Sequence, residues 1–348
     1  MLRTDEFDYP LPEDLIAAVP ARRRDASRLM VLDRKDGTLL HRDFSDICGF
    51  LGPGDLLVLN DTKVIPARIF GRKKNGGGRV EMVLLKDTGS DVWECLVQPA
   101  RRLKKGYEIE IKKGRAVILE EIDDSRRLIK FEVDGGLEKN LGRIGQVPLP
   151  PYIVEKLNIR QKLFGRLKER YQTVYADKPG ASAAPTAGLH FTAELLDKLR
   201  AKGVRIAYIT LHTGVGTFRP VLSEYVEGHR MFTEQYEISE ETSAEVRKAK
   251  EQKKRIVAVG TTVVRCLEDC YSKHGKIIPV KDEASIFIYP PFRFNVIDAM
   301  VTNFHFPKST LLMMVSAFAG REFVMKAYLE AVKLRYRFFS FGDAMLIL

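Results

Sequence analysis

The sequence predicts an α/β protein, in which a layered α/β domain with mostly parallel strands is interrupted by an inserted small antiparallel β-barrel domain. Three observations favour this class. A buried strand pattern stands near the amino terminus, short strand patterns crowd residues 67–147, and helix and strand patterns alternate after the proline-rich stretch 146–153. We therefore expect residues 1–65 and 151–348 to form one α/β catalytic domain and residues 66–150 to form the insert.

The early strand is "DLLVLND", whose continuous apolar run is typical of a strand that is buried on both faces. The insert begins with "ARIFGRKKNGGGRVEMVLL", which predicts a hairpin that turns around residues 75–78. It continues as "VWECLVQPA", "YEIEIKK", "AVILEEI" and "RLIKFEVDGG", which are short and separated by turn residues. So many short strands in one stretch predict a small barrel.

The carboxy-terminal part alternates between helix and strand. "TAELLDKLRAKG" predicts an amphipathic helix with Thr192 as its N-cap and Gly203 as its terminator, and the strand "VRIAYITLH" follows it. The unit repeats as "SEETSAEVRKAKEQKK" and "RIVAVG". Further on, "TLLMMVSAFA" predicts a core helix that Ser309 or Thr310 caps and Gly320 ends. The uncharged run from Ser309 to Gly320 is too short to cross a membrane.

The net charge of +11 is concentrated in one part of the chain. Residues 63–178 hold 26 Lys and Arg against 16 Asp and Glu. This favours a polyanionic partner such as nucleic acid, although a solvated basic surface would have the same composition. The start "MLRTDEFDYPLPEDL" lacks the pattern of a secretory signal, and the four cysteines lack a metal or redox spacing. We therefore expect a cytoplasmic protein with reduced thiols.

Polar residues follow apolar strands at four junctions: 59–68, 210–220, 259–265 and 301–310. Because ligands of open α/β sheets bind beyond the carboxyl ends of the strands, these junctions are the expected site. The helix that starts near Thr262 could bind an anion with its free backbone N–H groups, or Thr261 or Thr262 could simply cap it. Gly214 and Gly216 suggest a nucleotide loop, but Pro220 follows where a dinucleotide motif would open a helix.

Three histidines stand at or beside these junctions: His190, His212 and His305. A lone histidine in such a place is more often structural than catalytic, but side chains from separate strand ends could converge. Metal binding by these three histidines is an alternative. No histidine or cysteine pair has a ligand spacing such as a helical i, i+4 pair, so we expect no metal.

The chain resembles the S-adenosylmethionine:tRNA ribosyltransferase-isomerase family of queuosine synthesis along its whole length. The matching stretches are "LPEDLIAAVP", "LNDTKVIPARIFG", "VPLPPYI", "ERYQTVYA", "AAPTAGLHFT", "TLHTGVGTFRPV", "AVGTTVVRCLE", "TNFHFPKSTLLMMVSAFAG" and "YRFFSFGDAMLI". The resemblance implies an α/β domain with an inserted barrel. It also implies transfer of the ribosyl part of S-adenosylmethionine to 7-aminomethyl-7-deazaguanine at the tRNA wobble position, which gives epoxyqueuosine-tRNA and releases adenine and methionine, with no metal.

This chemistry requires a general base, a general acid and an oriented nucleophile. A base removes the acidified ribose 5′ proton beside the sulfonium, adenine leaves with help from an acid, and the aminomethyl nitrogen attacks. The catalytic candidates are His190, His212, His305 and Asp61. The substrate-binding candidates are Asn60, Thr62, Arg68, Tyr175, Thr186, Gly188, Gly214, Gly216, Thr217, Thr261, Thr262, Arg265, Thr302, Asn303, Ser309 and Thr310. Within this set, Arg265 with the helix start at Thr261 and Thr262 could hold the methionine carboxylate.

The basic third of the chain would then bind tRNA. Phosphate contacts are expected from Arg101, Arg102, Lys104, Lys105, Arg166, Lys168 and Arg170. The segment "EGHRMFTEQYEI" departs from the family pattern, because Phe232 stands where a second histidine is common, and the role of His229 is left open. The alternatives are a non-catalytic tRNA- or rRNA-binding protein and a methyltransferase, of which the latter lacks its glycine pattern. A monomer is the favoured state.

Overall fold

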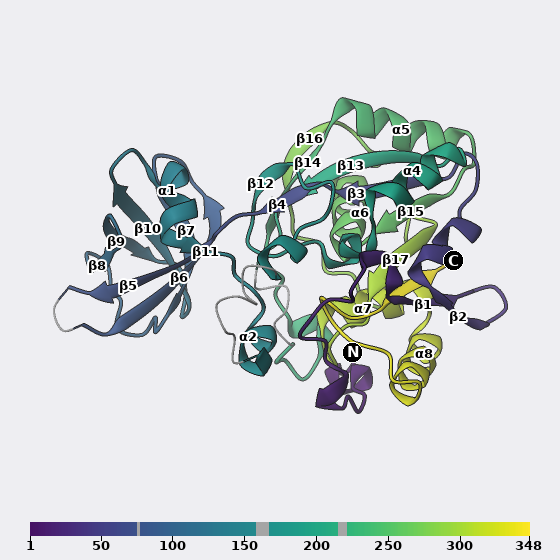
Figure 1. Cartoon of the computed structure of the whole chain (residues 1–348), viewed down its shortest axis with the longest axis horizontal. Helices are drawn as coiled ribbons and strands as arrows, with labels where there is room; N and C mark the ends of the chain where they lie inside the picture. Colours follow the sequence, from purple (N-terminus) through teal and green to yellow (C-terminus); the bar gives the residue numbers. More distant parts are fainter. Residues whose placement is uncertain (75–76, 158–166, 215–220) are drawn as a thin grey trace. The chain divides into compact units, whose positions relative to one another are not determined.

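The computed structural model describes residues 1–74, 77–157, 167–214 and 221–348. It contains two compact units (Figure 1). The first, the α/β unit, comprises Met1–Thr62, Pro151–Lys178 and Pro185–Leu348, and the second, the barrel unit, comprises Lys63–Pro150 and Pro179–Ala184. The mixed α/β class with a barrel insert is therefore confirmed.

The α/β unit is built on a mixed sheet, which has nine strands within the described ranges. In spatial order they are β16 (Val280–Ala284), β14 (Glu234–Ile238), β13 (Arg205–Leu211), β3 (Leu56–Asn60), β15 (Ile256–Val259), β17 (Ala299–Asn303), β18 (Ala344–Ile347), β1 (Arg28–Leu32) and β2 (Leu39–Asp43). The central run β13-β3-β15-β17 is parallel. Most of the remaining neighbours are antiparallel, and only β18 and β1 add a parallel pair.

The prediction of mostly parallel strands was therefore wrong for the flanks of the sheet. The repeating helix–strand units of the sequence cover only the central strands, where a crossover helix is needed to bring the chain back in parallel. On one flank, β1 and β2 are joined by the short turn at Asp33–Thr38, and a hairpin connection of this kind makes an antiparallel pair.

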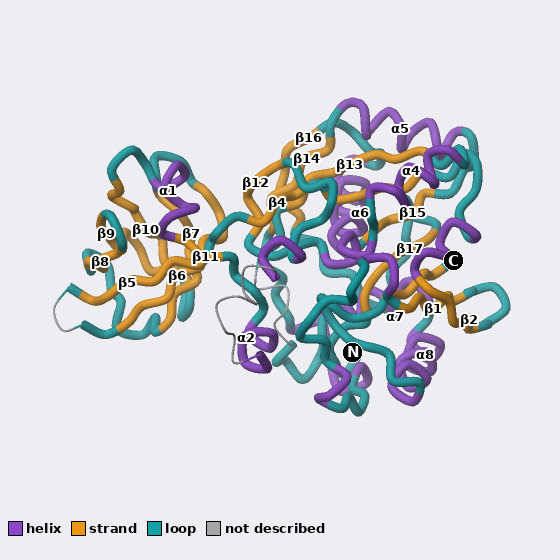
Figure 2. Tube along the Cα trace, viewed as in Figure 1, coloured by secondary structure: helices purple, strands orange, loops and turns teal. Residues whose placement is uncertain are grey.

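Helices cover both faces of the central strands (Figure 2). Leu56 and Val58 of β3 pack into a core with residues of four helices, whereas Leu57 and Leu59 pack with α4. The four helices are α5 (Glu240–Glu251), α6 (Thr261–His274), α7 (Thr310–Ala319) and α8 (Arg321–Lys333), and α4 spans Ala193–Ala201. A strand with alternate residues in two cores is buried on both sides, as its apolar run predicted.

The predicted helix ends are confirmed. Thr192 caps α4, since its side chain accepts a hydrogen bond from the backbone N–H of Leu195, and Ser309 caps α7 in the same way. The chain leaves α4 through Gly203, whose φ of +87° suits glycine, and α7 ends at Gly320. Short 3₁₀ turns also carry site residues, and these are η3 (Arg24–Ala26), η4 (Phe44–Gly49) and η5 (Thr186–His190).

The barrel unit holds a closed antiparallel barrel that is formed by six strands among its described residues. Around it run β5 (Arg68–Lys73), β6 (Arg79–Asp87), β7 (Val92–Gln98), β10 (Arg126–Val133), β9 (Gly114–Glu121) and β8 (Glu108–Ile111), and β8 pairs again with β5. Gly71 makes this closure possible, because a Cβ there would lie 2.7 Å from the carbonyl oxygen of Glu110. Half of the predicted turn 75–78 lies outside the described residues, namely 75–76.

The remaining elements of the chain are short. The barrel carries α1 (Leu137–Ile144) and β11 (Gly145–Gln146), α2 spans Pro151–Leu157, and β4 (Thr62–Val64) pairs with β12 (Lys178–Ala181). All four cysteines are free thiols. Among the helices that the structure describes, none is long and apolar enough to span a bilayer.

Candidate functional site

The carboxyl ends of the four central strands lie side by side at one edge of the sheet. Asn60 at the end of β3 is level with Ile209 of β13, and Gly260 follows Val259, whose partner on β17 is Val301. The junctions that the sequence singled out are therefore neighbours at this edge. Two groups of polar contacts lie there.

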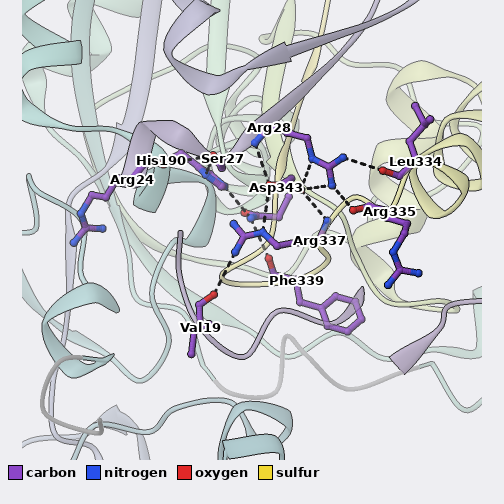
Figure 3. Close-up of polar contacts among 11 residues, drawn as sticks. Val19, Arg24, Ser27, Arg28, His190, Leu334, Arg335, Arg337, Phe339 and Asp343 are labelled. Carbon is purple, nitrogen blue, oxygen red and sulfur yellow. Dashed lines mark hydrogen bonds and ion pairs between the residues drawn. The ribbon is translucent and has the colours of Figure 1, made fainter. Parts of the chain in front are cut away.

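The first group, the Asn303 cluster, consists of Ser27, Thr186, His190, Asn303 and the carbonyl of Phe339. Figure 3 labels Ser27, His190 and Phe339 of this group. Oδ1 of Asn303 accepts a hydrogen bond from Oγ1 of Thr186 at 3.0 Å, and Nδ2 donates to the Phe339 carbonyl at 3.1 Å. Nδ2 also lies 3.1 Å from Nε2 of His190. Since an amide nitrogen can only donate, Nε2 accepts, and Nδ1 carries the proton and donates to Oγ of Ser27 at 2.7 Å.

His190 is a buried, neutral imidazole at neutral pH. Burial, opposed by Asp343 and reinforced by Arg337 and Arg24, lowers its pKa to about 4. Its ring stacks on Phe44 of η4, with 5.0 Å between the ring centroids. Both ring nitrogens are occupied within the cluster, so these contacts favour a positioning role for His190. Its predicted role as a base stays a prediction that requires one contact to open.

His305 is held in a similar way after β17. Its Nε2 lies 2.8 Å from Oγ1 of Thr302, and burial lowers its pKa to about 3. The backbone is fixed as well, because the hydroxyl of Tyr9 donates to the His305 carbonyl and the His305 N–H donates to the hydroxyl of Tyr328. These contacts tie the strand end to the core, and they favour a structural role for both Thr302 and His305.

The second group, the Asn60 cluster, joins β3, β13 and α6. Oδ1 of Asn60 accepts from the backbone N–H groups of Thr62 and Leu211, and Nδ2 donates to the Leu211 carbonyl and to Oγ1 of Thr262, all within 3.0–3.1 Å. The amide of Asn60 is thereby saturated. These contacts favour a role for Asn60 in bracing the strand ends, and its predicted contact with a substrate stays a prediction.

The helix α6 begins without a side-chain cap. Its N-cap is Gly260, with φ of +92°, and no side chain accepts from the first turn. Thr261 and Thr262 are the first helical residues, so neither is the cap that the alternative interpretation required. Uncapped N–H groups at the start of a helix favour an anion, as the first interpretation of this junction expected.

Asp61 and His212 are the two catalytic candidates that are only partly buried. Oδ1 of Asp61 accepts from Oγ1 of Thr210 at 2.6 Å, and Nδ1 of His212 lies 2.8 Å from Oγ1 of Thr62. Burial raises the pKa of Asp61, although the Thr210 hydrogen bond and Lys178 counteract it. Burial and Lys178 lower the pKa of His212. Both shifts favour the neutral forms, and this suits groups that exchange protons with a substrate.

Arg265 is engaged with protein groups rather than directed to an open site. Its guanidinium pairs with Glu234, and both side chains are nearly inaccessible, at 3% and 5% exposure. It also donates to the carbonyls of Phe232 and Ala284 at 3.2 and 3.1 Å. The other carboxylate oxygen of Glu234 accepts from the backbone N–H of Gly214 at 3.2 Å. The predicted contact of Arg265 with a methionine carboxylate would require this pair to open.

The other predicted substrate-binding residues serve varied structural roles. Ser309 caps α7, and Thr310 is buried in its first turn. Gly188 leaves room for Tyr175, since a Cβ there would lie 2.1 Å from the tyrosine hydroxyl. In the barrel unit, Arg68 pairs with Glu81 at 3.0 Å. Two substrate-binding candidates, Gly216 and Thr217, and the RNA-binding candidate Arg166 lie outside the described residues.

The predicted RNA-binding residues differ in exposure. Arg101, Arg102 and Lys105 are exposed on the barrel unit, where Lys104 pairs with Glu121 at 2.8 Å. In the α/β unit Lys168 is exposed. Arg170 instead donates to the carbonyls of Ala21 and Arg22 at 2.8 and 3.1 Å, so part of its charge is used within the fold.

Sequence reasoning missed several residues around the Asn303 cluster. Ser27 lies three residues after the run Arg22–Arg24, and these three consecutive arginines were the one available signal. The carboxylate of Asp343 forms ion pairs with Arg28 and Arg337 (Figure 3). The pairing of β1 with β18 brings Arg28 to Asp343 from 315 positions away, whereas Arg337 reaches it through the local loop, six residues before it. Within the described ranges, no group of three His, Cys, Asp or Glu side chains could hold a metal ion.

Comparisons with known proteins agree on one family. Residues 4–347 match the family model described as "Queuosine biosynthesis protein". Proteins named S-adenosylmethionine:tRNA ribosyltransferase-isomerase are 51% identical in Halothermothrix orenii and 49% identical in Clostridioides difficile, over 100% and 99% of this chain and the full length of each relative. The crystal structure of S-adenosylmethionine tRNA ribosyltransferase from Thermotoga maritima is 42% identical, covers 99% of this chain and 100% of its own, and has a TM-score of 0.54.

Proposed function

This chain belongs to the S-adenosylmethionine:tRNA ribosyltransferase-isomerase family of queuosine biosynthesis, and we propose that it catalyses the family's reaction on tRNA. It transfers and isomerises the ribosyl moiety of S-adenosylmethionine onto 7-aminomethyl-7-deazaguanine at the wobble position, and it releases adenine and methionine. The observation that carries the proposal is the full-length match at 51% identity. The enzyme acts in the cytoplasm as a monomer, and it uses no metal.

Asp61 and His212 are the best-supported acid–base residues. A base must take the ribose 5′ proton beside the sulfonium, and an acid must protonate the departing adenine. The raised pKa of Asp61 brings its carboxyl closer to the range in which it can exchange protons, and the lowered pKa of His212 keeps a neutral imidazole available. His190 and His305 support the site by holding Asn303 and Thr302.

The start of α6 is the best-supported position for the methionine carboxylate. The first turn has no side-chain cap, and its dipole favours a negative charge. The Glu234–Arg265 pair lies at the flank of this helix and orders Gly214 through its backbone N–H. A carboxylate at the α6 start would leave that pair intact.

The basic surface of the barrel unit supports a contact with tRNA. Arg101, Arg102 and Lys105 are exposed, and phosphate neutralisation is the main source of affinity in such interfaces. In this proposal the α/β domain that the sequence predicts at residues 1–65 and 151–348 is the catalytic domain. The barrel domain predicted at residues 66–150 is a separate domain for tRNA binding.

The test incubates the protein with S-adenosylmethionine and a tRNA that carries 7-aminomethyl-7-deazaguanine. Chromatography should detect free adenine, free methionine and the epoxyqueuosine nucleoside in equal amounts. S-adenosylhomocysteine with methylated tRNA would instead indicate a methyltransferase. Tight tRNA binding without any released adenine would indicate a non-catalytic RNA-binding protein.

A further inference from the structure

A small cavity of about 20 Å³ adjoins the Asn303 cluster in the α/β unit. Its polar lining consists of Arg24, Arg170, Arg337, Ser27, Ser340 and His190. A space of this size holds one oxygen-sized group rather than a nucleoside. Three arginines are thus among the residues that line it, and Figure 3 shows Arg24, Arg337 and His190 in this region.

Two of these arginines have no carboxylate partner among the residues that the structure describes. Arg24 donates to the carbonyls of Leu189 and Arg170, and Arg170 donates to the carbonyls of Ala21 and Arg22. Burial and the charge of Arg170 lower the pKa of Arg24, so each cation is unfavourable for the other. Of the three arginines, only Arg337 has a carboxylate partner within the described residues: its Nε lies 3.6 Å from Oδ1 of Asp343. An anion in the cavity would relieve this repulsion.

Ser340 supplies an unused hydroxyl in the same place. Its residue is 3% exposed, and its Oγ has no hydrogen-bond partner within the described ranges. The backbone N–H of Ser340 donates to the hydroxyl of Tyr152 at 3.0 Å, which fixes the residue beside the cavity. A buried hydroxyl without a partner is costly unless a ligand or water completes it.

We propose that this cavity binds one nonbridging phosphate oxygen of the tRNA backbone. The proposal rests on the proposed function, and it specifies where the α/β unit holds RNA. A long polyanion is favoured over a small carboxylate because Arg22, Arg23 and Lys168 are exposed on the neighbouring segments, so cationic surface continues beyond the cavity. The bound phosphate would lie beside His190 and therefore beside the edge at which the nucleoside reacts.

The test compares Ser340→Ala with wild type in tRNA binding, measured by fluorescence anisotropy with a labelled anticodon stem-loop. Because the Ser340 hydroxyl has no partner among the residues that the structure describes, its removal should not lower thermal stability. It should weaken RNA binding at least roughly tenfold through loss of a hydrogen bond to a charged group. The matched control is Ser316→Ala in α7, another buried serine whose hydroxyl lacks a partner in the described part of the chain. That variant should bind RNA as wild type does.

A second variant, Arg337→Gln, tests the charge. The negative slope of log K against log salt concentration should become shallower by roughly 0.7–0.9, as expected for one lost phosphate contact. Unchanged RNA affinity in Ser340→Ala would overturn the proposal and leave a water-filled cavity. Weaker binding of S-adenosylmethionine in calorimetry, with unchanged RNA binding, would also overturn it, since the cavity would then hold the methionine carboxylate. A wild-type protein that releases no adenine, but whose RNA affinity depends on Ser340, would refute the enzymatic function alone.

Discussion

The side-chain amide of Asn303 donates a hydrogen bond to Nε2 of His190 across 3.1 Å. This contact fixes the tautomer of the imidazole, because the same amide nitrogen donates to the Phe339 carbonyl while Oδ1 accepts from Thr186. The proton of His190 must then lie on Nδ1, which faces Ser27. The strand end at β17 and the turn η5 are thus joined by a directional network.

Asn303→Asp should reverse the direction of the hydrogen bond between residue 303 and Nε2 of His190. A carboxylate cannot donate to Nε2, so His190 would have to place a proton there, and a negative partner favours the imidazolium. We expect the pKa of His190 to rise from about 4 to above its ordinary value of 6.5. Histidine NMR titration measures this directly. A pKa that stays low would contradict the contact between the side chain of residue 303 and Nε2 of His190.

The buried histidines should also make stability depend on pH. Burial lowers the pKa of His190 to about 4 and that of His305 to about 3, so below pH 6.5 the unfolded chain binds protons that the folded chain does not. The free energy of unfolding should therefore fall on acidification from pH 6.5, by roughly 1.4 kcal/mol per pH unit for each histidine. Urea denaturation between pH 7 and 5 measures the slope.

The assignment of this slope to buried histidines can be checked by substitution. His305→Gln should reduce the slope by roughly 1.4 kcal/mol per pH unit, since one group that is protonated only in the unfolded chain is removed. His274→Gln is the control, because His274 is exposed at the end of α6. An identical slope in wild type and His305→Gln would contradict the assignment.

Asp61→Asn should abolish adenine release, with at least a 100-fold loss typical of a missing general base. It should leave tRNA binding within about twofold of wild type, because one partly buried carboxyl is changed to an amide of the same size. Since the pKa of Asp61 is raised, wild-type activity should decline on acidification at a higher pH than for an ordinary aspartate. Asp177→Asn is a matched control at an exposed neighbouring carboxylate. Full activity in Asp61→Asn would remove it as a catalytic residue.

Local patterns in the sequence predicted those parts of the fold that local physics determines. The caps at Thr192 and Ser309 follow from side chains that satisfy the next backbone N–H groups, and the buried strand β3 follows from its apolar run. The antiparallel flanks of the sheet were not predicted, because pairing between β17 and β18 depends on residues more than 40 positions apart.

The sequence predicted that the four junctions lie together, but it did not predict which contacts their residues make. The four junctions meet at one edge, since parallel strands carry their carboxyl ends together. Roles depend on contacts that a sequence does not display. Asn60 saturates its amide within the protein, Arg265 pairs with Glu234, and Ser27 reaches His190 from a segment 163 residues away.

The buried pair of Arg265 and Glu234 should matter more for stability than exposed pairs. Arg265→Ala would leave Glu234 buried without its counterion, at a cost of about 3–5 kcal/mol in the free energy of unfolding. Arg200→Ala is the control, because its partner Asp197 is largely exposed and such pairs contribute below about 1 kcal/mol. Urea denaturation compares the two. Adding Glu234→Gln to Arg265→Ala should recover part of the loss. Equal losses of stability in Arg265→Ala and Arg200→Ala would contradict the interpretation.

Charge reversal on the barrel unit should weaken tRNA binding. Arg101→Glu with Arg102→Glu replaces two exposed cations, so we expect the dependence of log K on log salt to fall by roughly 1.4–1.8 for two lost phosphate contacts. Filter binding across a salt series measures this slope. The control reverses Lys139 and Arg143, two exposed cations of α1 in the same unit, and makes the same change in net charge. If both double variants weaken binding equally, the effect is one of overall charge and the Arg101–Arg102 segment is not the contact.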